Sequence, residues 1–316
     1  MSFQPKGLFK GISLTWRLVI GVSTVLAIFL ILVSVVLIQE KAQENEASIK
    51  SGIANVLTMQ ATNIKHMLSS RYKILETTFD SPNVQQWMQS RRQQWEPLDD
   101  EPEYQVVNQF LKRVVASEPE ITSLFYSPMT TKEYWDENGR IPREVMTRSI
   151  EEIPWWKATV SAGGGVVNKP FEDSRTNIVS AALSKPVYAP NGQQIAIAGI
   201  DLKLEAIQSY VSENTKYQGI GNAFLFHPSG ELITVPEGVE LSKEQRTLTA
   251  LERLEGSSGF SQLNQSSEGV AFYNIHWHGS SFVVAVVELA LAEPLMHWQL
   301  GLIYPQSEID KPVEAA

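Results

Sequence analysis

The feature that most constrains this chain is an uncharged apolar segment close to its beginning. Residues 18–38 read LVIGVSTVLAIFLILVSVVLI, without one charged side chain. A helix of this length matches the roughly 30 Å hydrocarbon core of a bilayer. The segment is too long for the apolar part of a signal peptide, and no small-residue cleavage pattern follows it. We therefore predict a transmembrane helix over residues 18–38, with a buried core helix as the alternative.

The charges on either side of this segment orient it. All charged residues before the segment are basic, whereas most of the charged residues directly after it are acidic. The basic residues are Lys6, Lys10 and Arg17. Because an excess of basic residues stays in the cytoplasm, residues 1–17 are predicted to be a cytoplasmic N-terminus. Residues 40–316 then lie in the periplasm, and we expect a single-pass protein of a bacterial inner membrane.

The composition narrows the class of partner. The formal net charge is −9, and the chain holds 26 Lys and Arg residues without a cluster. Nucleic-acid binding requires a clustered basic surface, so we expect no nucleic-acid partner. The chain has no cysteine, which removes thiol nucleophiles and thiolate metal sites. An exported domain without disulfides must rely on its core, which suits a bacterial periplasm.

The helical pattern continues beyond the apolar segment. Apolar residues recur at steps of three and four as far as Phe79, as expected for one stripe of a 3.6-residue period. They include Ile49, Ile53, Val56, Leu57, Ala61, Ile64, Leu68, Tyr72 and Leu75. We predict a stalk helix over residues 40–80. Such a helix is too long to bury its stripe on one small subdomain, so it is expected to lie along two stacked subdomains or against a second copy. In a homodimer the stripe would form the seam.

The rest of the chain passes twice from helical to strand patterns. Helices are predicted at residues 84–94, 104–117 and 205–214. Strands are predicted at residues 121–127, 133–139, 187–202, 223–235, 270–279, 281–289 and 297–305. Their period is two, and turn residues such as Asn191-Gly192 separate them. The predicted fold class is α+β, with two stacked antiparallel sheet subdomains: a membrane-distal one at 81–204 and a membrane-proximal one at 205–310, followed by a tail at 311–316.

Several short motifs beyond the stalk resemble one protein family. They are IPWWKA (153–158), KPFED (169–173), SKPVY (184–188), AGIDL (198–202), FHPSGE (226–231) and LIYP (302–305). In order, spacing and position after a membrane helix, they resemble the extracellular double Cache sensor domain of bacterial receptors such as methyl-accepting chemotaxis proteins. The likeness covers roughly residues 40–310. It implies two PAS-like subdomains, a ligand pocket for amino acids or amines in the distal one, and chemotaxis as the commonest output.

The resemblance also implies a set of ligand-binding residues. Trp155 and Trp156 stand at an aromatic pair, Phe171 at a further aromatic position, and Asp173 and Asp201 at two acids that bind an ammonium group. We add Tyr126, on the strand predicted over 121–127, and Arg148. The candidate ligand-binding residues are thus Tyr126, Arg148, Trp155, Trp156, Phe171, Asp173 and Asp201.

The chain departs from the family pattern on the side that would hold a ligand carboxylate. Ile153 stands where the resemblance implies an arginine, and Arg148 stands where it implies a tyrosine. Carboxylates beside indole faces favour a desolvated cation through charge-assisted hydrogen bonds and cation–π contact. We therefore expect an amine-like or otherwise cationic ligand rather than an ordinary α-amino acid, unless Arg148 reaches the pocket.

Structural alternatives stay open for these residues. Trp155 and Trp156 are also typical core aromatics, and Asp173 is also a typical turn residue. Asp201 interrupts an apolar strand, where an unpaired carboxylate would be costly. A cation is expected beside it, either Arg148, a lysine or the ligand.

Other signals in the sequence carry less weight. His276 and His278 have a spacing that could bring both imidazoles to one strand face, but no third ligand accompanies them. Gly163-Gly164-Gly165 is interpreted as a flexible turn and Arg91-Arg92 as a solvated helix end. No nucleophile motif is present, so we expect no enzyme activity, no metal and no cofactor.

The first functional hypothesis is therefore a chemoreceptor-type sensor for a small solute. In the resembling receptors a second membrane helix and an effector would follow near Ala316. The alternatives are a single-pass anchored periplasmic binding module that acts through a partner, or a truncated sensor of a histidine kinase or diguanylate cyclase.

Overall fold

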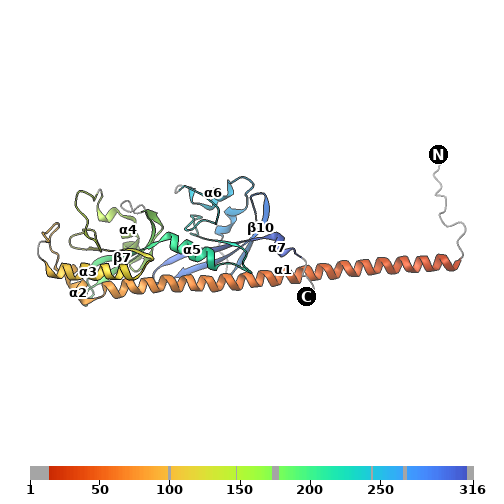
Figure 1. Ribbon diagram of the computed structural model, residues 1–316, viewed down its shortest axis with the longest axis horizontal. Helices are drawn as coiled ribbons and strands as arrows, with labels where there is room; N and C mark the ends of the chain where they lie inside the picture. Colours follow the sequence, from red (N-terminus) through yellow and green to blue (C-terminus); the bar gives the residue numbers. More distant parts are fainter. Residues whose placement is uncertain are drawn as a thin grey trace. The chain divides into compact units, whose positions relative to one another are not determined.

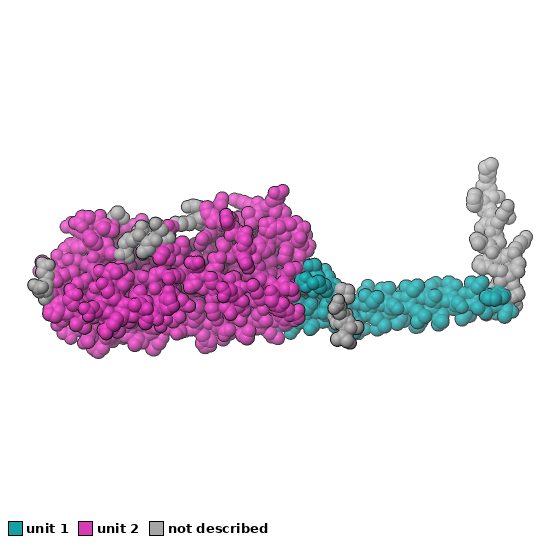
Figure 2. Space-filling model, in the orientation of Figure 1, with its two compact units in different colours: residues 1–51, 307–316 teal, residues 52–306 magenta. Residues whose placement is uncertain are grey.

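The structure is a computed structural model that describes residues 14–98, 101–146, 148–172, 178–242, 245–265 and 269–311. The chain divides into two compact units, coloured separately in Figure 2. The smaller unit comprises residues 1–51 with 307–316, and the larger unit comprises residues 52–306.

The smaller unit contains the exposed apolar part of helix α1 (Leu14–Phe79). Every side chain from Leu18 to Ile38 is exposed. Among the described residues, α1 is the one helix long and apolar enough to cross a membrane, and its apolar part is not buried. None of the residues that the structure describes covers this surface, so burial among them does not explain it. Elsewhere in this unit, the Asn45 amide donates a hydrogen bond to the Ile309 carbonyl oxygen at 3.1 Å.

In the larger unit, residues 52–79 of α1 run along two antiparallel sheets, the first of which has seven strands (Figure 1). Its strands are β1 (Ile121–Pro128), β2 (Trp135–Asp136), β3 (Gly139–Arg140), β4 (Val166–Val167), β5 (Phe171–Glu172), β6 (Val179–Tyr188) and β7 (Gln194–Lys203). Their order is β3-β2-β1-β7-β6-β4, and β5 also pairs with β6. The helices before and around it are α2 (Pro82–Ser90), α3 (Pro102–Ser117), η1 (Ile150–Glu152) and α4 (Pro154–Ala162). Helix α5 (Leu204–Asn214) leads from this sheet to the second one; the two are labelled distal and proximal after the expected subdomains.

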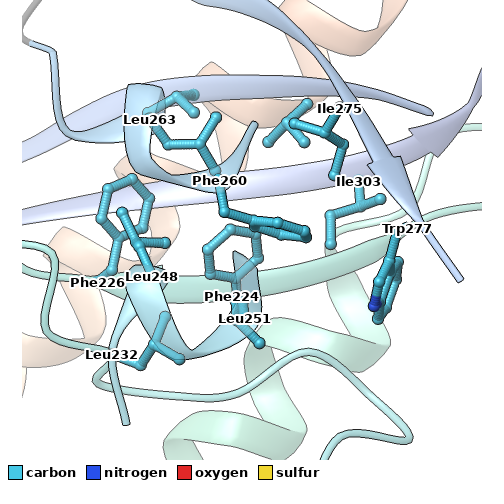
Figure 3. Close-up of a cluster of buried hydrophobic side chains, with 12 residues drawn as sticks. Phe224, Phe226, Leu232, Leu248, Leu251, Phe260, Leu263, Ile275, Trp277 and Ile303 are labelled. Carbon is cyan, nitrogen blue, oxygen red and sulfur yellow. The ribbon is translucent and has the colours of Figure 1, made fainter. Parts of the chain in front are cut away.

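The second, proximal sheet has four strands in the order β8-β11-β10-β9. Its strands are β8 (Asn222–Phe226), β9 (Ala271–Trp277), β10 (Ser280–Leu291) and β11 (Met296–Pro305). Helix α6 (Leu248–Glu252) and η3 (Phe260–Asn264) cover one face, and the short helix α7 (Gln306–Ile309) follows β11. Figure 3 shows that aromatic and aliphatic side chains from the sheet, α6 and η3 fill the space between them. The proximal subdomain therefore has a solid apolar core on this face.

One predicted strand forms only in its first half. Residues 223–235 were expected to make a strand, a turn and a second strand, but the chain after Gly230 forms isolated bridges only. The reason is local: the backbone N–H groups of Ile233 and Thr234 both donate to the Leu225 carbonyl oxygen, at 2.8 and 3.1 Å. Two donors on one acceptor curl the chain and end the regular ladder.

The apolar stripe of α1 is buried against the sheets of its own chain. Ile53, Leu57, Ile64, Leu68, Leu75 and Phe79 all have 0% of their surface exposed. The expectation that this stripe forms the seam of a homodimer is therefore wrong, because its side chains already contact both subdomains. The alternative expectation, that the helix lies along two subdomains, describes the larger unit.

A second correction concerns the end of α2. Arg91 was expected to be solvated, but it is only 3% exposed. Its guanidinium carbon lies 5.1 Å from the ring centroid of Trp87, and it donates to a Glu101 carboxylate oxygen at 2.8 Å. The loop after α2 folds back over the guanidinium because the acidic residue before α3 provides its counter-charge.

We predict that the stripe carries much of the stability of the larger unit. Replacing Leu68, which is 0% exposed, by alanine should lower the free energy of unfolding by about 2–5 kcal/mol, since a cavity remains. The matched control is Met59→Ala on the same helix, where the side chain is 53% exposed and the loss should stay below about 0.5 kcal/mol. Urea unfolding of the full chain in detergent measures both. Equal losses would contradict the packing described.

Candidate ligand-binding site

The two faces of the distal sheet differ in what covers them. On β1, Phe125 and Tyr126 are neighbours and so point to opposite faces. Tyr126 is directed towards the helices: its hydroxyl accepts a hydrogen bond from Trp87 Nε1 at 2.7 Å, and its ring lies 5.8 Å from that of Phe79. Phe125 is directed towards α4, where it contacts Trp155. The sheet therefore separates a helix-facing layer from a layer under α4.

The layer under α4 is built from aromatic side chains. The ring centroids of Phe125 and Trp155 are 4.8 Å apart, and those of Trp155 and Trp156 are 5.9 Å apart with an edge-on geometry. Tyr134 stacks on Phe125 at 5.7 Å, and Phe171 packs at the margin of the cluster. Both indoles are almost fully buried. The structure thus brings Trp155, Trp156 and Phe171 together.

The start of α4 explains why both indoles reach this cluster. Ile153 adopts an extended backbone at the N-cap, and Pro154 occupies the first turn, where its missing N–H costs nothing. The two tryptophans therefore lie in the first turn of a short helix packed on β6. Ile153, which stands at the family's arginine position, packs against the same apolar cluster.

Asp201 lies on the same face of the sheet as the indoles. It is 3% exposed and pairs with Ser123 on β1 and with Ala182 on β6. Side chains two positions apart on a strand share a face. Ile197, four positions before Asp201, belongs to the aromatic cluster, as does Ala182. The register therefore places the Asp201 carboxylate beside the layer that holds Trp155 and Trp156.

Two further buried acids flank Asp201, and sequence reasoning missed both. Asp136 is 2% exposed and is the ladder partner of Phe125. The Glu137 carboxylate accepts hydrogen bonds from the Ser123 hydroxyl at 2.9 Å and from the Leu124 backbone N–H at 3.2 Å. Because Ser123 is also the ladder partner of Asp201, the acids at 137 and 201 converge on one point of the sheet.

The environment shifts the pKa of one of these carboxyl groups. Burial raises the pKa of Glu137, and the neighbouring charge of Asp136 raises it further, against the opposing effect of the hydrogen bonds from its own backbone, Ser123 and Leu124. A sheet face with several buried carboxylates beside indole rings can hold a cation, since a cation relieves both their repulsion and their desolvation. No sequence signal identified Asp136 or Glu137, because only strand pairing brings the turn at 137–138 to β1.

The remaining predicted site residues do not join this cluster. Tyr126 lies on the opposite, helix-facing side of the sheet, because side chains alternate between the two faces along β1. It therefore does not belong to the candidate site under α4. Arg148 is exposed. Asp173 lies outside the described residues. His278 lies in the turn between β9 and β10 with φ 49°, so it does not share a strand face with His276. The described part of the chain contains no group of histidines and acids suited to a metal ion.

A cavity of about 340 Å³ lies elsewhere in the larger unit. Its lining includes Tyr72 of α1, Asp80 just after that helix, Gly165 after α4, Lys185 of β6 and Glu293 in the turn between β10 and β11. The Lys185 ammonium group bonds both Asp80 carboxylate oxygens at 3.0 Å. This cavity is distinct from the aromatic layer under α4.

Comparison with known proteins identifies this arrangement. Residues 98–209 match the family model described as methyl-accepting chemotaxis protein-like, first PDC sensor domain. The ligand-binding domain of the Pseudomonas fluorescens chemoreceptor CtaA, solved with L-isoleucine, is 17% identical with a TM-score of 0.61, and the match covers 83% of this chain and 96% of that one. The larger unit has the double Cache fold.

Other proteins that this chain resembles are chemoreceptors or their ligand-binding domains. The ligand-binding domain of Pseudomonas aeruginosa PctB, solved with L-Arg, is 17% identical with a TM-score of 0.59 over 80% of this chain and 94% of that one. The same organism's PctC domain, solved with GABA, is 19% identical with a TM-score of 0.55 over 79% and 96%. The methyl-accepting chemotaxis protein McpC of Bacillus subtilis is 34% identical over 107 residues, which are 33% of this chain and 16% of McpC. The matched region is therefore a small part of that receptor.

The raised pKa of Glu137 predicts a pH dependence of stability. The folded state holds this proton more tightly than the unfolded state, whose carboxyl has the ordinary value of 4.5. The free energy of unfolding should therefore fall as pH rises from 4.5 through the raised pKa. Glu137→Gln should remove this decline. The difference in unfolding free energy between the variant and the wild type should therefore rise from pH 4.5 to the raised pKa and stay constant above it.

The control for this measurement has the opposite sign. Hydrogen bonds from Ser261, together with one from the Gly259 backbone, lower the pKa of Glu252. Its charge stabilises the fold above pH 4.5, and that contribution is lost as pH falls through the lowered pKa. Glu252→Gln should therefore be less sensitive to acid than the wild type. Urea unfolding of the full chain between pH 3 and 7 tests both variants, and parallel curves for Glu137→Gln and wild type would contradict the environment assigned to Glu137.

Proposed function

We propose that this chain is the extracytoplasmic sensing part of a chemoreceptor-type signal transducer, and that its distal subdomain binds a small amine or amino-acid-like solute. The distal subdomain is taken as residues 81–204 and the proximal one as 205–310. Residues 18–38 anchor the domain in a bacterial inner membrane, with residues 40–316 in the periplasm. Support comes from the chemotaxis-type family match of residues 98–209 and from the exposed apolar segment of α1.

The observation that carries the ligand proposal is the group of buried acids beside the indoles. Asp136, Glu137 and Asp201 are each more than nine-tenths buried on or beside the face that carries Trp155. Transferring a carboxylate from water to a protein interior is costly unless opposite charge or donors compensate it. A ligand ammonium group supplies the opposite charge, and the indole face adds cation–π attraction.

The other side of the cluster favours an amine without a carboxylate. At the family's arginine position, Ile153 packs among apolar side chains, and Arg148 is exposed. The solved relatives hold L-isoleucine, L-Arg and GABA, each with an ammonium and a carboxylate group. In this chain the ammonium side of such a ligand has acidic partners, whereas Ile153 offers a carboxylate no charge.

Pairs of ligands that differ only by a carboxylate test this proposal. The pairs are agmatine with L-arginine, propylamine with GABA, and 2-methylbutylamine with L-isoleucine. In nanodiscs, one of the amines should raise the thermal midpoint of the full chain, corresponding to about 2.7 kcal/mol at 100 times its dissociation constant. Its amino-acid counterpart should bind at least about tenfold more weakly, because its carboxylate loses hydration without gaining a partner.

Variants assign the binding to the acids of the sheet. Asp201→Asn should weaken binding of that amine by about 10- to 100-fold in calorimetry, the effect of losing a hydrogen bond to a charged group. The matched control is Glu205→Gln, an exposed acid four positions further along, which should bind like the wild type. Equal affinities within every ligand pair would contradict the preference for amines. Unchanged binding by Asp201→Asn would contradict the site.

The output of the protein is proposed from its relatives. McpC of Bacillus subtilis and McpA of Pseudomonas putida are both methyl-accepting chemotaxis proteins, so we propose chemotaxis rather than catalysis as the role of the whole receptor. We also propose that the receptor acts as a homodimer. Because the stripe of α1 is buried within one chain, the two copies must meet through other surfaces.

A further inference from the structure

The turn between β10 and β11 belongs to the proximal subdomain but pairs with the distal sheet. The Leu295 backbone N–H donates to the Gly165 carbonyl oxygen at 2.7 Å, and the Val167 N–H donates to the Leu295 carbonyl oxygen at 3.0 Å. Val166 and Leu295 form a parallel bridge. Through these bonds Leu295 of the proximal subdomain pairs with β4 at the edge of the distal sheet. The two subdomains therefore share a short ladder.

The Glu293 carboxylate ties three elements together beside this ladder. One of its oxygens accepts a hydrogen bond from the Gly165 backbone N–H at 2.7 Å. The same oxygen accepts a hydrogen bond from the Tyr72 hydroxyl on α1. Burial and the Glu293 charge raise the pKa of Tyr72, so the phenol remains a proton donor at neutral pH. A single carboxylate oxygen thus joins α1, the segment after α4 and the proximal turn.

Gly165 admits this junction because it has no side chain. A Cβ atom at this position would lie 2.1 Å from the Tyr72 hydroxyl oxygen and 2.4 Å from the Glu293 oxygen, distances that non-bonded atoms do not adopt. Any larger residue would separate the carboxylate from the backbone N–H. The sequence alone suggests that residues 163–165 form a flexible turn. In the structure this glycine run is a point of close approach between the two subdomains.

The junction is connected directly to the helix that carries the indoles. Helix α4 places Trp155 in its first turn and ends at Ala162, after which Gly163 adopts a left-handed conformation with φ 66°. Gly163 to Gly165 and Glu293 also line the 340 Å³ cavity, which leaves space for the glycine run to move. A displacement of α4 must therefore act on Gly165, and through it on Glu293 and the proximal turn.

We propose that the Glu293 junction couples the aromatic layer under α4 to the proximal subdomain. Tyr72 fixes the carboxylate relative to α1, so movement of α4 changes the Gly165 bond and the β10–β11 turn together. The role of the junction in sensing rests on the proposed function, because the movement of α4 would be caused by a ligand bound under it. The mechanical coupling itself is a property of the chain without ligand.

Hydrogen exchange of the ligand-free full chain in nanodiscs tests the coupling. Glu293 is exposed, so Glu293→Ala leaves the apolar cores intact. Amide exchange within α4, whose residues Glu293 does not touch, should become about tenfold faster, as expected when a hydrogen bond to a charged group no longer restrains a local opening. Tyr72→Phe removes one bond from the same oxygen and should produce a smaller change in the same amides.

The control removes another contact between the subdomains. Glu231, next to the β8 end, forms an exposed ion pair with Lys169 beyond β4. Glu231→Gln should leave exchange within α4 unchanged. In the reverse direction, Trp155→Phe should alter exchange at the amides of Glu293, Leu295 and Met296, which lie in the other subdomain. If Glu293→Ala accelerates only the amides of Gly165 and of the proximal turn, the coupling is wrong.

This measurement is independent of the proposed ligand. The exchange of ligand-free protein decides whether the junction couples α4 to the proximal turn, whereas calorimetry with agmatine and L-arginine decides the ligand class. Once a binding amine is found, wild-type β10 and β11 should show altered exchange on binding, and Glu293→Ala should bind with a similar affinity but lose at least about half of that response. A full response in Glu293→Ala would overturn the junction's role in sensing.

Discussion

The larger unit depends on burying one side of α1 along both sheets. The buried residues of the apolar stripe on that side, from Ile53 to Phe79, are each at most 5% exposed. Polar contacts hold the same helix at its margins: Arg71 pairs with Glu118 and Glu120 at 2.9 Å each. Because hydrophobic burial grows with the area removed from water, a helix that serves two small sheets stabilises each more than a separate short helix could. The shared helix also gives both subdomains a common reference, against which Tyr72 holds Glu293.

The two sheets use the same architecture for different chemistry. On the face away from α1, the proximal sheet is covered by α6 and η3 over a filled cluster of aromatic and aliphatic side chains. The corresponding face of the distal sheet carries Ser123, Asp201 and the acids of the β2–β3 turn beside two indoles. Polar groups in such a position lower stability unless they are compensated. The raised pKa of Glu137 is one sign of that cost, and shifted pKa values of this kind cluster at functional sites.

The Glu293 junction lies between the distal face that carries the acids and the packed proximal core. The proximal core is packed and α1 is continuous through the larger unit, so neither provides an obvious moving part. The segment after α4 differs, since three consecutive glycines there border open space, and the last of them, Gly165, accepts a backbone hydrogen bond from the proximal turn. A few hydrogen bonds at such a point are weak enough to rearrange and directional enough to transmit displacement, which suits coupling energies of about 1–3 kcal/mol.

The sequence by itself determined the charge-free apolar segment at 18–38, the long helix, the α+β class and the resemblance to double Cache sensors, because charge-free length and hydrophobic period are local properties. It also indicated Trp155, Trp156, Phe171 and Asp201 as candidates, whose joint role in binding stays a proposal. Only the tertiary structure decided which way side chains face. Strand alternation turned Tyr126 towards the helices, packing against both sheets removed the α1 stripe from any dimer seam, and ladder pairing brought Glu137 to Asp201. The contact of Glu293 with Tyr72 and Gly165 joins residues far apart in the chain, and no local pattern encodes such a meeting.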